Sequence, residues 1–314
     1  MVIARHADRV IVGREQAPAL PLKVVRKMII ESHAHYAHAS FTGNFRYLSW
    51  DDNWTLKEGT LEDLLGQMEE RGIAMSVEPG IGLDFHEKIF ALTDKYPGKI
   101  FPAVGCHPTR CFYEKWSDRR RLEEYCDHPG VVAIGETGLD YHHPREEQHR
   151  FKQYIWFLYQ LRLARKRKLP LILHIRDADR EAIRVLKLFK PKYGGVVHCC
   201  GEGWEYISEY LKLGLHIGVG GVLLNPARNE RLKAAVPLIP LDRILVETDS
   251  PYVLPYCKDV LPPKLVRRCR NSSLILPRVI EEIARLKGVS ETEVERVTAQ
   301  NAVKLYRLPA TERT

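Results

Sequence analysis

The chain has 314 residues and a mass of 36.2 kDa, and 45% of its residues are hydrophobic, so it can form one large α/β domain or two smaller ones. The net charge of +8 favours an anionic partner, although basic helix faces such as residues 162–168 explain much of the excess. Seven cysteines without a CxxC pair argue against a disulfide framework and for a reducing compartment. Without an apolar membrane span or a signal-peptide core, we expect a cytoplasmic protein that does not contact membranes.

Strand-like and helical segments alternate along most of the chain. Residues 1–27 are expected to be an N-terminal extension with a proline-containing linker, and residues 28–314 a single domain. Apolar strand-like runs occur at residues 28–33, 73–77, 100–105, 131–136, 170–174, 195–198, 215–219 and 244–248. Helical patterns occur at residues 61–71, 84–96, 119–126, 145–168, 178–189, 204–213, 274–286 and 291–305. Eight strands with intervening helices predict a closed (β/α)8 TIM barrel rather than an open sheet.

Metal-binding residue types recur where these predicted strands end. Residues two apart in a strand point the same way, so one histidine pair can bind a single cation. The carboxyl ends of parallel strands meet on one face of a barrel, where such folds place ligands and chemistry. A histidine after an apolar strand is, taken alone, more often a hydrogen-bonded core residue. The shared position of six such residues favours a centre for two divalent metals, and the candidate ligands are His33, His35, Glu136, His174, His198 and Asp249.

The segment after the first predicted strand, residues 41–57, is rich in aromatic residues. It contains Phe45, Tyr47, Trp50 and Trp54, and it is expected to overhang the metal end of the barrel. Aromatic side chains next to a cationic residue can stack on nucleic-acid bases. The alternative, a small structural lid with its own aromatic core, is slightly favoured.

The ordered set of motifs resembles the TatD-type metal-dependent deoxyribonucleases, which belong to the amidohydrolase-like barrels. The resemblance covers residues 28–306. It includes the HxH pair at residues 33–35, GxHP at 105–108, a GEIGLDY-type signature at 135–141, a QLxLA…LPxxIHxRxA block within 160–178, His198-Cys199, and segments 247–252 and 298–302. The chain departs from the family pattern at Glu31, where aspartate is usual, and at residues 198–201 and 270–273. The resemblance implies that residues 28–314 form a metal-dependent hydrolase domain.

The family pattern also implies roles for individual residues. His33, His35, Glu136 and Asp249 would hold one metal, and Glu136, His174 and His198 the other. Mixed nitrogen and oxygen ligands suit zinc, manganese or iron, whereas magnesium is a less natural candidate. Asp249, as general base, and the bridging Glu136 are the expected catalytic residues.

Two further residues, His107 and Arg176, are candidates for binding the substrate phosphate. The structural alternatives are a hydrogen bond from His107 that fixes the turn before Pro108, and a pairing of Arg176 with Asp140 or Asp177.

The expected function is metal-assisted hydrolysis of phosphodiester bonds, with single-stranded DNA degraded from one end. One alternative retains the same metals in a hydrolase for small amides, lactones or phosphoesters. A closed pocket would favour that alternative, and an open basic groove would favour DNA. A binding protein without catalysis is the third interpretation, and it is disfavoured because every ligand position is filled.

Overall fold

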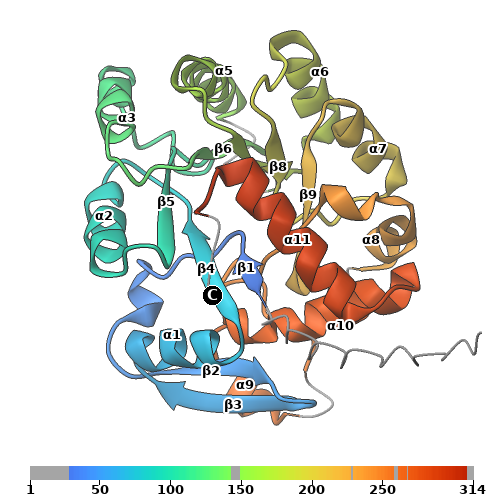
Figure 1. The fold of residues 1–314 in the computed structure, drawn as a ribbon. Coiled ribbons are helices and arrows are strands. Elements are labelled where there is room, and N and C mark those ends of the chain that lie inside the picture. Colours follow the sequence, from blue (N-terminus) through green and yellow to red (C-terminus); the bar gives the residue numbers. More distant parts are fainter. Residues whose placement is uncertain (1–27, 143–148, 228, 258–260, 267, 310–314) are drawn as a thin grey trace, which may run out of the picture.

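The computed structural model describes residues 28–142, 149–227, 229–257, 261–266 and 268–309. The predicted extension, residues 1–27, lies outside these ranges. Eight parallel strands form the central sheet, in the spatial order β1-β4-β5-β6-β7-β8-β9-β10 (Figure 1). Their bounds are β1 Ile29–Glu31, β4 Ile73–Glu78, β5 Ile100–Val104, β6 Ala133–Asp140, β7 Leu171–Arg176, β8 Gly195–Val197, β9 His216–Val219 and β10 Ile244–Val246.

Backbone hydrogen bonds between the first and last strands complete the ring. The amide of Ser32 donates to the carbonyl of Val246 at 3.1 Å, and the amide of Asp249 donates to the carbonyl of His33 at 2.9 Å. The predicted (β/α)8 barrel is therefore confirmed, and each of the eight predicted strands overlaps one observed strand.

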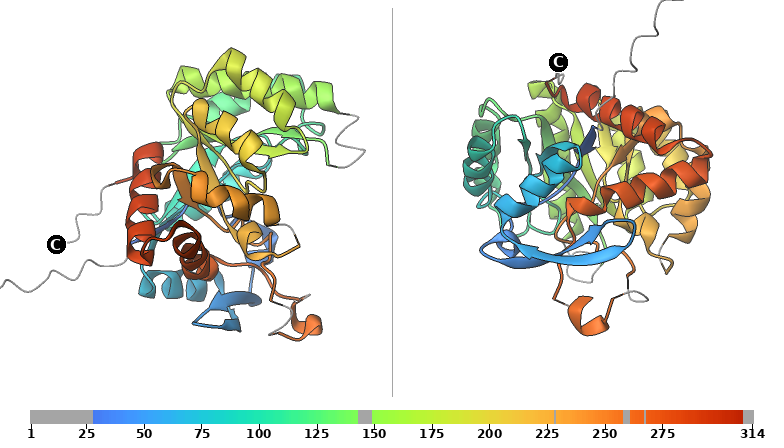
Figure 2. Two further views of the ribbon diagram at one scale, coloured as in Figure 1. Left: turned by 90° about the vertical axis from the view of Figure 1, so that its right-hand side faces the viewer. Right: turned by 60° about the horizontal axis from the view of Figure 1, so that its bottom comes forward.

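The helices surround the barrel, as the views in Figure 2 also show. Their bounds are α1 Leu61–Glu70, α2 His86–Lys95, α3 Arg119–Tyr125, α5 Arg150–Arg167, α6 Asp179–Phe189, α7 Trp204–Lys212, α8 Glu230–Ala235, α9 Pro263–Val266, α10 Leu276–Lys287 and α11 Glu291–Tyr306. Short 3-10 helices occur at Ala39–Phe41, Trp116–Asp118, Gly221–Leu224, Val236–Leu238, Leu241–Arg243 and Ser273–Ile275. Local signals set several helix ends: Thr60 and Asp63 form a capping box at the start of α1, and Gly288 ends α10 with a φ of 67°.

Two apolar clusters form the core. The larger lies between the barrel and the surrounding helices. The smaller fills the inside of the barrel with strand residues such as Ile30, Val77 and Ile172, and it continues into Ala302 and Leu305 of α11. Helix α11 contacts β1 and β10, and Nδ2 of its Asn301 donates to the carbonyls of Leu241 and Ile244 where β10 begins, so it covers the end of the barrel opposite the carboxyl ends of the strands. No helix in the described ranges is long and apolar enough to cross a membrane.

The aromatic segment 41–57 differs from the expectation, because it forms an antiparallel hairpin of β2 (Phe45–Trp50) and β3 (Trp54–Gly59). Asp51, in the turn of the hairpin, pairs with Arg71, which lies two residues before β4 begins. The turn therefore lies towards the amino ends of the strands, and the expectation that Trp50 and Trp54 overhang the metal end is wrong. The end of the hairpin opposite the turn, its base, is formed by the pair Phe45 and Gly59.

Candidate metal centre

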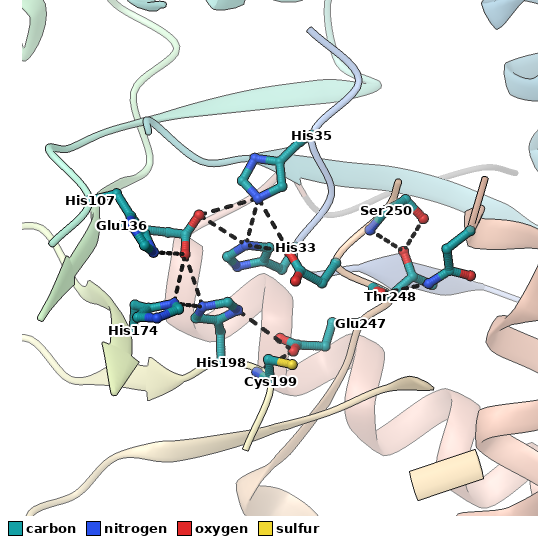
Figure 3. Close-up of polar contacts among 12 residues, drawn as sticks. His33, His35, His107, Glu136, His174, His198, Cys199, Glu247, Thr248 and Ser250 are labelled. Atoms are coloured by element: carbon teal, nitrogen blue, oxygen red, sulfur yellow. Dashed lines mark hydrogen bonds and ion pairs between the residues drawn. The ribbon is translucent and has the colours of Figure 1, made fainter. Parts of the chain in front are cut away.

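The barrel strands bring all six predicted ligands to one place. His33 and His35 follow β1, Glu136 lies in β6, His174 lies in β7, and His198 follows β8 (Figure 3). Asp249 follows β10. Most of these side chains are buried. Together with His107, these residues form three overlapping groups, and the ligand atoms of each group lie within 4.8 Å of one another. The groups are His33-His198-Asp249, His33-His35-Glu136 and His107-Glu136-His174.

Glu136 lies between two groups of imidazoles. Its Oε1 atom lies 3.5 Å from Nε2 of His33 and 3.2 Å from Nε2 of His35. Its Oε2 atom faces the other group, at 2.9 Å from Nε2 of His198 and 3.4 Å from Nδ1 of His174. A carboxylate whose two oxygens face different ligand groups has the geometry needed to bridge two cations.

Asp249 lies close to His33 and His35, the two histidines that face Oε1 of Glu136. Its Oδ1 atom lies 3.4 Å from Nε2 of His33 and 3.2 Å from Nε2 of His35. The side chain of Asp249 is 14% exposed, compared with 4% for Glu136. Asp249 is therefore the carboxylate of the centre that is more accessible to solvent.

Imidazole nitrogens also approach one another closely. The Nε2 atoms of His33 and His35 are 3.3 Å apart, and Nδ1 of His174 is 3.0 Å from Nε2 of His198. Nitrogen lone pairs that converge with carboxylate oxygens are the donor set that binds transition-metal cations. The residues around Glu136 therefore fit a divalent-metal site.

The protonation equilibria of the centre agree with this donor set. Burial and the neighbouring His198 lower the pKa of His33 to about 4, which favours the neutral imidazole. Burial opposes ionisation of Glu136, but the surrounding imidazoles of His198, His33 and His107 hold its pKa well below the ordinary value. Neutral imidazoles and ionised carboxylates are the forms that coordinate metals.

His35 and His174 show the opposite shift. Burial would lower both pKa values, but hydrogen bonds with buried carboxylates raise the pKa of His35 well above its ordinary value and that of His174 to about 9. The carboxylates thus attract positive charge to these two positions. A divalent cation between the same atoms would supply that charge and displace the protons.

Asp140 orients one of the candidate ligands. Its Oδ2 atom lies 3.0 Å from Nε2 of His174, which directs Nδ1 of that ring towards Glu136. Burial opposes ionisation, but the hydrogen bond with His174 holds the pKa of Asp140 at about 2. Sequence reasoning missed this role: the four-residue spacing from Glu136 puts both side chains on one face of β6, but it does not identify His174 as the partner of Asp140.

The two predicted substrate-binding residues differ in position: His107 is buried within the cluster, and Arg176 is exposed. Nε2 of His107 is 3.6 Å from Oε2 of Glu136. Arg176 ends β7, two residues beyond His174, and its side chain is exposed. The carboxylates suggested as its partners have other contacts: Asp140 faces His174, and Asp177 lies 2.7 Å from Nδ1 of His142.

The hydrogen bonds of His107 define its tautomer. The backbone amide of Thr109 donates to Nδ1 of His107 at 3.1 Å, and a backbone N–H can only donate. Nδ1 is therefore an acceptor, and Nε2 of the neutral ring carries the proton that points into the centre. The turn-fixing interaction considered for His107 is thus present, and it occupies Nδ1 of the ring.

The fold and the cluster define the class of the protein, a metal-dependent hydrolase built on a (β/α)8 barrel. Comparison with known proteins agrees. The model of the family described as "TatD related DNase" matches residues 30–307, and the chain belongs to this family.

Individual relatives span most of the chain. A "3'-5' ssDNA/RNA exonuclease TatD" from Cronobacter sakazakii is 32% identical over 252 residues, which cover 78% of this chain and 91% of the relative. A protein of the same name from Erwinia billingiae is 34% identical over 252 residues, covering 79% and 94%. The fold is similar to that of a TatD homologue from Escherichia coli, with a TM-score of 0.77, 23% identity and coverage of 90% and 98%.

Proposed function

We propose that this protein is a nuclease that uses two divalent cations to hydrolyse phosphodiester bonds of single-stranded nucleic acid from the 3' end. The observation that carries the proposal is the division of Glu136 between two imidazole groups, with one oxygen facing each. His33, His35, Glu136 and Asp249 would hold one cation, and Glu136, His174 and His198 the other. When bound, such a pair supplies an activated water near neutral pH and positive charge for the phosphoryl oxygens.

The protein's own side chains would perform the remaining steps. Asp249 is the accessible carboxylate of the centre, and it would accept the proton of the attacking water. His107 would donate its Nε2–H to a phosphoryl oxygen, because Thr109 occupies the other ring nitrogen. The exposed guanidinium of Arg176 would attract the phosphate as it approaches the rim.

The direction and substrate of the reaction rest on the relatives. Their names specify 3'-5' exonuclease activity on single-stranded DNA and RNA, and the alignments include most of each relative. The same donor set would also activate water against a small amide or lactone. That alternative has less support, because the curated relatives described above are nucleases.

The test begins with metal content. Purified protein should be stripped with a chelator, reloaded with manganese or zinc, and analysed for bound metal. We expect up to two ions per chain in the reloaded protein. If reloaded protein showed no metal in anomalous scattering among the six candidate ligands, the proposal would be wrong.

Activity is then measured on single-stranded oligonucleotides labelled at the 5' end. Removal of nucleotides from the 3' end should give a ladder of shortened labelled products, and phosphorothioate linkages at the 3' end should suppress it. The same protein should be tested with small lactones, amides and phosphoesters. Rapid turnover of one of these, with intact oligonucleotides under the same conditions, would favour the small-molecule hydrolase.

A further inference from the structure

An open cavity of about 320 Å³ lies outside the metal centre, at the base of the β2–β3 hairpin. Its polar lining includes Ser40, Asn44, Arg46, Glu58, Arg268 and Arg270. The last two residues come from the segment that follows α9, and this segment is hydrogen-bonded to β2: the amide of Arg270 donates to the carbonyl of Arg46 at 2.8 Å. Figure 2 shows the hairpin and α9 on the same side of the barrel.

The cavity carries an excess of positive charge. Glu58, the one carboxylate among the described residues of its lining, accepts hydrogen bonds from Arg46 at 2.9 Å and Asn44 at 3.1 Å. The guanidinium of Arg270 contacts two backbone carbonyls, those of Ser40 and Arg268, each at 3.4 Å. Within the described ranges, no carboxylate forms an ion pair with Arg268 or Arg270. Two guanidinium groups are therefore left to interact with an anion.

A series of neighbouring residues lies between the cavity and the metal centre. Ser40, in the cavity wall, donates its backbone N–H to Nδ1 of His38 at 3.1 Å. The ring of His38 lies 5.4 Å from that of Tyr252, and Tyr252 lies 5.8 Å from the candidate ligand His35. Tyr252 is 45% exposed, so its ring forms part of the surface between the two sites.

We propose that the Arg268–Arg270 cavity binds backbone phosphates of the nucleic-acid strand at a distance from the bond that is cut. This inference rests on the proposed nuclease function and specifies how the substrate is held. A strand with its terminal phosphodiester at the metal centre passes Tyr252 and His38 and enters the cavity. Each guanidinium offers a planar set of donors that matches a phosphate group.

The composition of the cavity favours a backbone over a free nucleotide. The aromatic residue in its lining is Phe45, which is 6% exposed and offers little surface for stacking a base. Contacts limited to phosphates carry no sequence information, which suits an enzyme that degrades a strand from one end. The cavity therefore increases affinity for long strands whatever their base sequence.

Binding of non-hydrolysed strands tests the proposal directly. Fluorescence anisotropy measures the affinity of the metal-loaded protein for a labelled phosphorothioate oligonucleotide. A length of about 12 nucleotides is a typical single-strand site size. R268A should weaken binding about tenfold, and R268A/R270A should weaken it further. The slope of log affinity against log salt should decrease by about 0.7 for each phosphate that the variant protein no longer neutralises. R184A, which removes an exposed arginine from α6, is the matched control and should change neither quantity.

A dinucleotide distinguishes the strand backbone from a small phosphate ligand. A dinucleotide has a single phosphodiester, which would occupy the metal centre, so it brings no further backbone phosphate to the cavity and its affinity should be the same in R268A and the wild type. An equal loss for the dinucleotide and the long strand would overturn the proposal, and so would unchanged affinity for the long strand in R268A/R270A. If the wild type bound the long strand through these arginines but cut no nucleic acid, the proposed function would fail while the cavity assignment stood.

Discussion

At the scale of single residues, Asp249 offers the clearest test of the chemistry. Its φ of 56° lies in the left-handed region, which asparagine tolerates at least as well as aspartate, so D249N should fold normally. The amide cannot accept the proton of a water molecule, and turnover of a chromogenic phosphodiester should fall by about 10²–10⁴-fold. Metal content is measured on the same sample. Near-normal turnover with metal retained would show that Asp249 is a ligand without a role as base.

The sequence departs from the family pattern at Glu31. The carboxyl group of Glu31 is buried behind the centre and accepts hydrogen bonds there. Its Oε1 atom accepts from the amides of His33 at 3.1 Å and Thr248 at 3.0 Å. Its Oε2 atom contacts the hydroxyls of Thr248 at 2.6 Å and Ser273 at 2.7 Å. Because hydroxyls can donate or accept, the site also suits a protonated carboxyl group.

This arrangement gives the stability of the protein a pH dependence with a defined sign. Burial raises the pKa of Glu31 from 4.5 to about 7. Between these values the folded protein binds a proton that the unfolded chain has lost, so the free energy of unfolding decreases as pH rises from about 4.5 to about 7. E31Q cannot ionise, and its stability relative to the wild type should therefore increase across this window.

The measurement is denaturant unfolding of both proteins at several pH values. E31L is the matched variant, because it leaves the amides of His33 and Thr248 without an acceptor. It should lose about 1–3 kcal/mol for each unpaired group at every pH. Parallel pH profiles for E31Q and the wild type would contradict this account of Glu31.

At the scale of elements, the β2–β3 hairpin replaces the expected aromatic loop. Trp50 and Trp54 pack edge to face with ring centroids 4.9 Å apart, and Arg278 of α10 lies over the Trp50 ring at 5.4 Å. Tyr47 is fully buried and its hydroxyl accepts from Gln67 of α1 at 2.6 Å. These aromatic side chains join the hairpin to neighbouring helices, as the alternative of a structural aromatic core suggested.

W54A should therefore reduce stability and leave nucleic-acid binding intact. Loss of the half-buried ring and its contact with Trp50 should lower the free energy of unfolding by about 1–3 kcal/mol. The affinity for a single-stranded phosphorothioate oligonucleotide should be unchanged, because the turn of the hairpin lies away from the metal end. Urea unfolding and anisotropy measure the two effects. Weaker oligonucleotide binding with unchanged stability would restore the stacking interpretation of this segment.

At the scale of the whole molecule, the metal centre joins strands from all around the barrel. Its candidate ligands are spread from His33 to Asp249, so cations bound there would hold β1, β6, β7, β8 and β10 together. Binding to the folded state alone stabilises it, by about 2.7 kcal/mol when the free ion is at 100 times its Kd.

We expect the thermal midpoint of chelator-treated protein to rise as manganese or zinc is added. H174A, which removes a ligand of one group and the partner of Asp140, should require more metal for the same rise. Scanning fluorimetry across a metal titration measures both. A midpoint that is insensitive to metal, in protein shown by elemental analysis to bind it, would mean that the centre does not couple the strands.

The sequence by itself determined the positions of the barrel strands and the presence of ligand-type residues at their ends. Runs such as Val131–Ile134 and Leu171–Leu173 are recognisable because burial on both faces of a parallel strand requires nearly continuous apolar residues. The topology then follows from the alternation with helices, and the shared end of the strands brings His33, Glu136 and Asp249 together.

Other features depended on contacts between distant segments, and only the tertiary structure decided them. The pairing of Asp140 with His174 spans 34 residues, and the acceptor site of Glu31 uses a hydroxyl 242 residues away. The cavity likewise unites Arg46 with Arg268 and Arg270. Local sequence does not specify such neighbours, because a polar side chain takes its role from the groups that the fold brings within hydrogen-bonding distance.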